Sequence, residues 1–173
     1  MRLTRDRTLR VLLGVGLFGY AEWFFGNLYE GVVLTPNLGR STQEALHHWR
    51  AFFRVSNPVY YYIPLAPVSV AATLAAAAIG WRGPRERRRW LAGAAAAGTG
   101  AAGVTYWFVT KLNVNLFFGG RSEEEAAALY RSKIGVSTAL GVARLALVAT
   151  AFWCAGRARR TTDPVGSASI EEG

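Results

Sequence analysis

Residues 55–81 read VSNPVYYYIPLAPVSVAATLAAAAIGW, a stretch of 27 residues without a single charged side chain. An α-helix needs roughly 20 consecutive apolar residues to cross the hydrocarbon core of a bilayer. In a soluble helical bundle, polar residues would return about every 3.6 positions on the outward face. This stretch lacks such a polar stripe, so it indicates a membrane-spanning helix rather than a helix of a soluble bundle.

Three further stretches have the same character. Residues 11–34 carry only Glu22 and Glu30 as charged side chains, residues 90–110 carry none, and residues 134–156 carry only Arg144. We therefore predict an all-α protein, a four-transmembrane-helix bundle that forms a single domain over residues 1–160. The predicted spans lie at about residues 11–34, 55–81, 90–112 and 133–156. Residues 161–173 are small, polar and acidic, and we expect them to form a disordered cytoplasmic tail.

The distribution of basic residues predicts the orientation. The chain has a formal net charge of +9, and 12 of its 20 basic residues lie in three segments: 2–10, 82–89 and 157–160. An even number of spans places these three segments on one side, and the positive-inside rule makes that side the cytoplasm. Both termini are then cytoplasmic, most simply at the plasma membrane. This reading accounts for the basic charge without nucleic acid as a partner.

The composition argues against a metal site and against an internal disulfide. Cys154 is the single cysteine and His47 and His48 are the two histidines. Adjacent residues on a helix point about 100° apart and cannot both ligate one metal ion. We expect no metal and no cofactor. An Arg-rich start before an apolar run resembles a signal peptide, but the apolar run continues to Leu34, so we expect a retained span.

Local motifs set the predicted limits of the helices. Ser122 followed by Glu125 has the spacing of a capping box and predicts a helix start. Gly83-Pro84 predicts the turn on the cytoplasmic side, and residues 42–53 predict a further helix that carries the two histidines. Outer loops are expected at Thr35-Pro36-Asn37 and Gly119-Gly120.

Side-chain size predicts a bundle that is narrow at the cytoplasmic end. Residues 71–79 and 91–103 consist almost wholly of small residues, and two stripes recur every four positions: Gly93, Ala97, Ala101 and Ala95, Thr99, Gly103. Small residues at this spacing allow helices to approach closely in a membrane. The opposite half carries large aromatic residues, and Pro64 and Pro67 should bend or open the second span there. We expect either a pocket or a belt of interfacial aromatic residues in that half.

Two charged residues are predicted to lie at one depth in the membrane. At about 1.5 Å of rise per residue, Glu22 and Arg144 both fall near the middle of their spans. A charge in the bilayer usually faces a partner or the bundle interior. We predict that Glu22 and Arg144 form a buried ion pair, directly or through Ser137 or Thr138. Such a pair could fix neighbouring helices, or its carboxylate could give a proton to a substrate.

The better candidate site lies near the outer boundary. Glu30, Asn27 and Trp23 share one helical face, and Tyr106, Thr110 and Asn113 repeat the same spacing on the third span. Asn57, Tyr60 to Tyr62, and the stripe Tyr130, Ser137, Arg144 should converge on the same region. A carboxylate, amides and phenols suit a planar phenolic or quinone-like molecule that partitions into lipid. For each residue taken singly, solvation at the interface is the alternative.

The order of these features resembles the DUF1772, or anthrone oxygenase-like, family of small four-helix membrane proteins. The resemblance covers about residues 8–158. It rests on Gly26 and Thr35-Pro36-Asn37, on Trp49 in a loop, and on the third-span ending Thr110-Lys111-Leu112-Asn113-Val114-Asn115-Leu116. Thr110, Asn113 and Leu116 fit the family's arrangement, and Arg131 or Arg144 could supply its arginine.

This resemblance implies a cofactor-independent monooxygenase that oxidises a lipophilic aromatic molecule. Glu30 would act as the base, while Asn27 and Asn113 would hold the developing oxyanion. The substrate-binding residues would be Trp23, Tyr61, Tyr106, Thr110 and Arg131. The alternative is a non-catalytic membrane protein that binds a lipid or small hydrophobe, or an assembly partner of a membrane complex. A proton-coupled transporter fits less well, and a homo-oligomer stays open.

Overall fold

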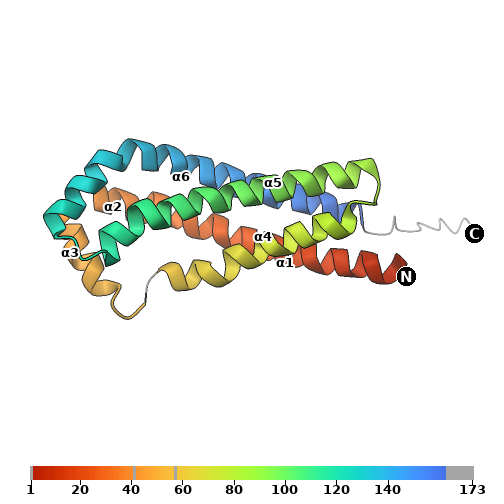
Figure 1. The fold of residues 1–173 in the computed structure, drawn as a ribbon, viewed down its shortest axis with the longest axis horizontal. Helices are drawn as coiled ribbons and strands as arrows, with labels where there is room; N and C mark the ends of the chain where they lie inside the picture. Colours follow the sequence, from red (N-terminus) through yellow and green to blue (C-terminus); the bar gives the residue numbers. More distant parts are fainter. Residues whose placement is uncertain (1, 41, 57, 163–173) are drawn as a thin grey trace, which may run out of the picture.

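The computed structural model of this chain describes residues 2–40, 42–56 and 58–162. Within these ranges the protein is helical throughout and has no strand. Four long helices lie side by side along the long axis of the molecule (Figure 1): α1 (Arg2–Tyr29), α4 (Pro58–Gly80), α5 (Arg85–Phe108) and α6 (Glu123–Arg160). The predicted all-α architecture is therefore confirmed.

Shorter elements gather at one end of these helices. α1 continues through a π-helical segment, η1 (Glu30–Leu34), into the short helix α2 (Thr35–Arg40), and α3 (Thr42–Phe52) follows. α5 likewise continues into a second π-helical segment, η2 (Val109–Phe118). The starts of α1 and α5 and the ends of α4 and α6 lie at the opposite end of the molecule (Figure 1).

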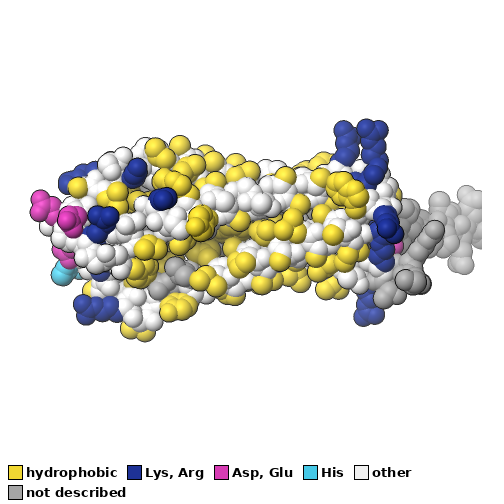
Figure 2. All heavy atoms as spheres, in the orientation of Figure 1, with side chains coloured by type: hydrophobic (Ala, Val, Ile, Leu, Met, Phe, Trp, Pro, Cys, Tyr) yellow, Lys and Arg dark blue, Asp and Glu magenta, His cyan; other side chains and the backbone are white. Residues whose placement is uncertain are grey.

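Three helical stretches of the described chain are long and apolar enough to cross a membrane, namely Arg5–Gly39, Tyr60–Gly80 and Glu123–Arg160. The predicted span at residues 90–112 is helical but lies outside this set. Its glycine, threonine, tyrosine and tryptophan residues lower its mean hydropathy. The side chains along the middle of the visible face are mostly hydrophobic, and those of Lys and Arg lie at its two ends (Figure 2).

Small residues allow close helix packing in the half of the molecule that contains the start of α1 and the end of α6 (Figure 1). Ala97 and Ala101 of the first predicted stripe are buried, and Gly98 beside them faces the fully buried Tyr20 of α1. An ideal Cβ on Gly98 would collide with the Tyr20 hydroxyl. The second predicted stripe was wrong, because Thr99 and Gly103 are exposed. The two stripes lie on different sides of α5, and only one faces the bundle.

Arginines tie the helices together at the same end. Arg5 of α1 donates to the carbonyl of Ile79 at the end of α4. Arg87 of α5 forms an ion pair with Asp6, at 3.3 Å, and donates to the carbonyl of Thr161 at 2.9 Å. Orphan carbonyls at helix C-termini are good acceptors for such guanidinium groups. The three predicted basic segments thus meet in one place.

The predicted helix limits mostly agree with the structure. Ser122 and Glu125 form the capping box, and the turn before α5 contains Gly83 and Pro84. Gly120 has a positive φ of 67°, as a loop glycine can. The loop expected at Thr35-Pro36-Asn37 was wrong, because these residues begin α2. Proline fits the first turn of a helix, and the Thr35 hydroxyl satisfies the Glu30 carbonyl at 3.0 Å.

The prolines of the second span do not open it. α4 stays helical through Pro64 and Pro67. The next turns add side-chain hydrogen bonds to the backbone, since Ser69 donates to the carbonyls of Leu65 and Ala66. These are not the carbonyls that the prolines leave without an N–H donor, which belong to Tyr60 and Ile63, but proline is tolerated within membrane helices. The wide region of the bundle therefore has another cause, the placement of α3 and the two π-helical segments.

Candidate functional site

Helix α3 packs across the end of the bundle and is held there by two polar contacts. The guanidinium of Arg50 donates to the carbonyl of Leu116, at 2.8 and 2.6 Å, and to that of Arg121 at 2.9 Å. His47 Nδ1 lies 2.8 Å from the Glu123 carboxylate at the start of α6. Arg50 thereby supplies hydrogen-bond donors to carbonyls at and just after the end of η2, where few backbone N–H groups are free to donate. These contacts fix α3 in place against η2 and the start of α6, so that it closes this end of the bundle.

An inner cavity of about 350 Å³ lies behind α3, between α1, η1, η2 and α6. Its walls are mainly aliphatic and aromatic, and its volume is at the small end of the range for ligand sites. The polar residues that line it come from five different elements: Asn27, Glu30, Thr35, Asn113, Tyr130, Ser137, Thr138 and Arg144. An apolar cavity with a few convergent polar groups is the usual form of a small-molecule site.

An ion pair lies in the wall of the inner cavity. Arg144 Nη2 lies 3.5 Å from the Glu30 carboxylate, and the two side chains are only 12% and 27% exposed. The Arg144 guanidinium also lies 4.6 Å from the centre of the Phe108 ring. The Tyr62 hydroxyl of α4 interacts with the same carboxylate. The pair leaves the cavity without net charge.

The predicted partner of Arg144 was therefore wrong. Glu22 instead accepts a hydrogen bond of 2.6 Å from the Tyr61 hydroxyl, on the α4 side of α1. Eight residues of α-helix turn the chain by about 80° beyond two full turns, so Glu22 and Glu30 face different neighbours. Ser137 and Thr138 bridge no charges, since both donate to the carbonyl of Ile134. The partner of Arg144 was therefore decided by the direction in which each side chain points around its helix, and not by depth in the membrane alone.

Two buried polar side chains in the cavity wall lack a partner. Among the residues that the structure describes, neither side-chain polar atom of Asn27 nor the Tyr130 hydroxyl has a hydrogen-bond partner, and these two residues are 2% and 3% exposed. Leaving a buried polar group unpaired costs about 1–3 kcal/mol. Asn27 offers a donor and an acceptor, and Tyr130 can act as either. Both residues are among those that line the inner cavity.

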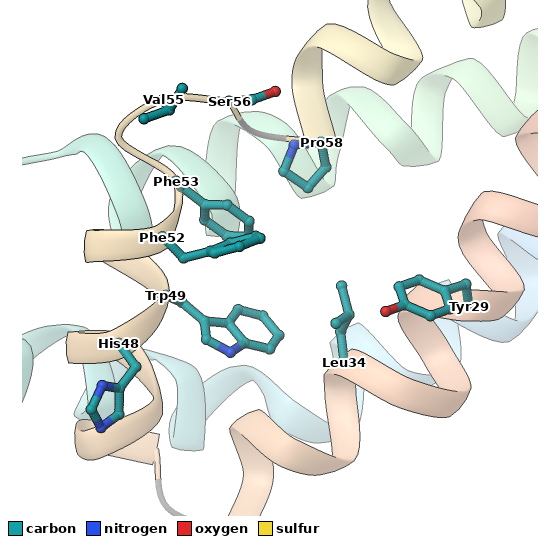
Figure 3. A pocket seen from close by; sticks show the side chains of 9 residues that line it. All are labelled: Tyr29, Leu34, His48, Trp49, Phe52, Phe53, Val55, Ser56 and Pro58. Atoms are coloured by element: carbon teal, nitrogen blue, oxygen red, sulfur yellow. The ribbon is translucent and has the colours of Figure 1, made fainter.

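A second, outer cavity of about 780 Å³ lies between η1, α3 and the start of α4. Figure 3 shows Trp49 and Phe52 of α3, and Phe53 directly after it, extending toward Tyr29 and Leu34, while the His48 ring points away. Val55, Ser56 and Pro58 complete the lining. Leu34, Trp49, Phe53 and Pro58 line both cavities, so the outer and inner cavities adjoin.

The structure gathers part of the site predicted from the sequence. Asn27, Glu30 and Asn113 all line the inner cavity, although their catalytic roles stay predictions. The five predicted substrate-binding residues do not line either cavity, for the described lining contains none of Trp23, Tyr61, Tyr106, Thr110 or Arg131. Trp23 is buried in the central core, 1% exposed. Tyr61 is bonded to Glu22, and Arg131 is exposed.

The stripe Tyr106, Thr110, Asn113 fails for a geometric reason. Tyr106 is 72% exposed and Thr110 donates to the Tyr106 carbonyl, while Asn113 turns inward. These residues cross from α5 into η2, where i to i+5 bonding places more residues in each turn. A stripe counted at 3.6 residues per turn therefore loses its register. Both π-helical segments line the cavity, which agrees with the frequent occurrence of π-bulges at functional sites.

Sequence reasoning missed the residues of α3 that build the site. Trp49 lies in this helix and Phe53 directly follows its end, where the Phe53 N–H donates to the Trp49 carbonyl; both residues line both cavities. Arg50 between them anchors the helix. The signal was present as an aromatic pair at helical spacing. The pattern did not show which surface this pair would cover.

No group of three or more potential metal-ligating side chains occurs among the residues that the structure describes. The His47 and His48 rings contact each other edge to face, with centroids 5.6 Å apart. His47 is engaged with Glu123, as above, and His48 lies at the outer cavity with its ring turned away.

Comparisons with protein-family models, with curated proteins and with solved structures find no match to this chain. The fold and the site therefore define its class by themselves. It is an all-helical protein with three helical stretches of membrane-crossing length and apolarity, and with a largely apolar cavity at one end. The resemblance to the anthrone oxygenase-like family stays a prediction.

Proposed function

We propose that this chain is a multi-pass integral membrane protein that binds a lipophilic aromatic molecule in its inner cavity. The three apolar helical stretches and the hydrophobic band between charged ends support a membrane location (Figure 2). We assign α5 as a fourth span because it lies alongside α4 and α6 over the length of the bundle (Figure 1). A helix of small residues inside such a bundle needs little hydropathy of its own.

The proposed orientation follows from charge. The end formed by the starts of α1 and α5 carries most of the excess arginine, so it faces the cytoplasm by the positive-inside rule. At the opposite end, acidic side chains such as Glu44 and Glu124 accompany the basic ones. Both termini are then cytoplasmic, and the two cavities open in the outer half of the bilayer of the plasma membrane.

One observation carries the binding function: the unpartnered Asn27 and Tyr130 in an apolar cavity whose two charges neutralise each other. A neutral ring with a carbonyl or hydroxyl oxygen would complete their hydrogen bonds without adding a charge. A carboxylate or phosphate would leave the buried Glu30 in repulsive surroundings. The substrate class is therefore a neutral aromatic ketone, phenol or quinone.

Binding of anthrone to the protein in lipid nanodiscs tests this function. We expect Asn27→Leu to weaken binding at least about fivefold, since a lost hydrogen bond to a buried partner costs about 1–3 kcal/mol. Asn37→Leu is the matched control, because Asn37 is exposed and bonds to the Val33 carbonyl away from both cavities. Equal binding by wild type and Asn27→Leu, or none by either, would contradict the proposal.

A second candidate function, oxidation of the bound ring, is favoured by the convergence of Glu30, Asn27 and Asn113 on the inner cavity. The Glu30 carboxylate would take a proton from the activated ring carbon. The resulting ring anion would react with dioxygen, and an anthrone would give an anthraquinone and water. The amides of Asn27 and Asn113 would donate to the oxyanion. The alternative, an assembly partner of a membrane complex, needs no ligand at this site.

Oxygen uptake with anthrone, above the rate without protein, separates binding from turnover. We expect Glu30→Gln to lower the rate at least about 100-fold, as the loss of a general base commonly does. Glu22→Gln is the control because Glu22 faces α4 and does not line the cavity. Turnover by purified Glu30→Gln equal to that of wild type would remove Glu30 as the base.

A further inference from the structure

The two cavities adjoin and differ in their chemical environment. The inner cavity contains the ion pair, the amide of Asn27 and the hydroxyl of Tyr130. The outer cavity is lined mainly by aromatic and aliphatic side chains, and the His48 ring beside it is turned away (Figure 3). The boundary between them consists of four apolar residues, Leu34, Trp49, Phe53 and Pro58.

The outer cavity is larger than the inner one and opens to the surroundings of the protein. Phe52 and Val55 on its rim are 77% and 94% exposed. Exposed large apolar side chains at this level would contact acyl chains in the proposed orientation. A molecule that occupies only the inner cavity would leave this apolar space unused, whereas an attached chain would fill it and continue into the lipid.

We propose that the ligand is a tailed lipid. Its neutral, oxygen-bearing ring lies between Asn27 and Tyr130, and its apolar tail passes Leu34 and Trp49 into the outer cavity. A quinone or quinol with a long hydrocarbon side chain has this chemistry. The inference rests on the proposed binding function and adds to it the tail, the second cavity and the direction from which the ligand arrives.

Two probes test the tail: a benzoquinone ring without a side chain, and the same ring with a decyl chain. Both are titrated at equal mole fraction in nanodisc lipid, so that partitioning into the bilayer does not enter the comparison. We expect the decyl compound to bind at least about fivefold more tightly, because its tail gains many individually small van der Waals contacts with the walls of the outer cavity. Phe52→Ser should reduce the ratio of the two affinities, and Phe18→Ser, an exposed phenylalanine on α1, should not.

Photolabelling locates the two parts of the ligand independently of affinity. A diazirine at the end of the decyl chain should label peptides of α3 and residues 53–56, and a diazirine on the ring should label α1 and α6. Equal affinity of the two quinones, or tail labelling on α1 and α6, would overturn the tail and leave the binding function intact. Failure of both quinones and of anthrone to bind would instead overturn the binding function itself. Tighter binding of a decyl alcohol than of decyl quinone would overturn the ring.

Discussion

The Glu30 carboxylate lies 3.5 Å from Nη2 of Arg144, although 114 positions separate the two residues in the chain. The contact joins the end of the first long helix to the middle of the last one. A charge placed alone in a bilayer costs at least ~2.5 kcal/mol, so each of these residues depends on the other. The pair also forms part of the inner cavity wall, which links the stability of the bundle to the shape of its candidate site.

We expect single substitutions of this pair to be more harmful than the double one. Glu30→Gln or Arg144→Met leaves an uncompensated charge among half-buried side chains and should each lower stability by about 3–5 kcal/mol. The double variant should recover much of this loss. Unfolding titrations in mixed detergent micelles measure the three values. A double variant as unstable as the sum of the single ones would show that the two charges are not coupled.

Two glycines of α5 give a matched test of close helix packing. Gly98→Ala should lower stability by about 1–3 kcal/mol, because the new methyl group meets the buried Tyr20. Gly103→Ala adds the same methyl group to open space on the same helix. It should be neutral or stabilise by up to about 1 kcal/mol through helix propensity. Similar thermal unfolding of the two variants would contradict the close contact between Gly98 of α5 and Tyr20 of α1.

Arg50 should control the order of α3. Arg50→Met removes hydrogen bonds to the carbonyls of Leu116 and Arg121, and a charged hydrogen bond is worth about 1.5–3 kcal/mol. We expect faster amide hydrogen exchange in residues 42–52 and unchanged exchange in residues 145–155. Exposed Arg54, one turn further on, provides the control Arg54→Met. Unchanged exchange in α3 of the Arg50 variant would show that apolar packing alone holds this helix.

The proposed orientation predicts which side of the membrane each end faces. In a Cys154→Ala background, Arg85→Cys should react with a membrane-impermeant maleimide only after the membrane is permeabilised. Glu124→Cys, at the exposed start of α6, should react in intact cells. Reaction of both positions in intact cells would mean that α5 does not separate the two ends. The reversed pattern would invert the bundle.

Local sequence patterns predicted the features of the fold that depend on interactions between neighbouring residues. The Ser122 and Glu125 capping box, the Gly83-Pro84 turn and the helix over residues 42–53 each depend on a few neighbouring residues, and the structure contains all three. Thr35-Pro36-Asn37 was read as a loop, although proline also suits the first helical turn. Asn27, Glu30 and Asn113 all line the inner cavity, because each lies in the half of the molecule that contains α3 (Figure 1), while their catalytic roles stay predictions.

Local sequence patterns could not predict which faces of the helices contact each other. The partner of Arg144 depends on the rotation of α1 and on the π-helical turns at η1, neither of which follows from depth along the chain. The stripe through Tyr106 and Thr110 failed because η2 changes the number of residues per turn. Trp49 and Phe53 became cavity residues only when α3 packed over the end of the bundle.

The amino-acid sequence alone determined that this chain is helical, rich in membrane-length apolar segments and strongly basic at one end, because each of these properties depends on composition and periodicity within one segment. The tertiary structure decided which charges meet, which small-residue stripe faces inward and where empty space remains. These features depend on the relative rotation of the helices and on the position of α3. The physical reason is that a cavity is lined by several segments packed together, so no single segment determines it.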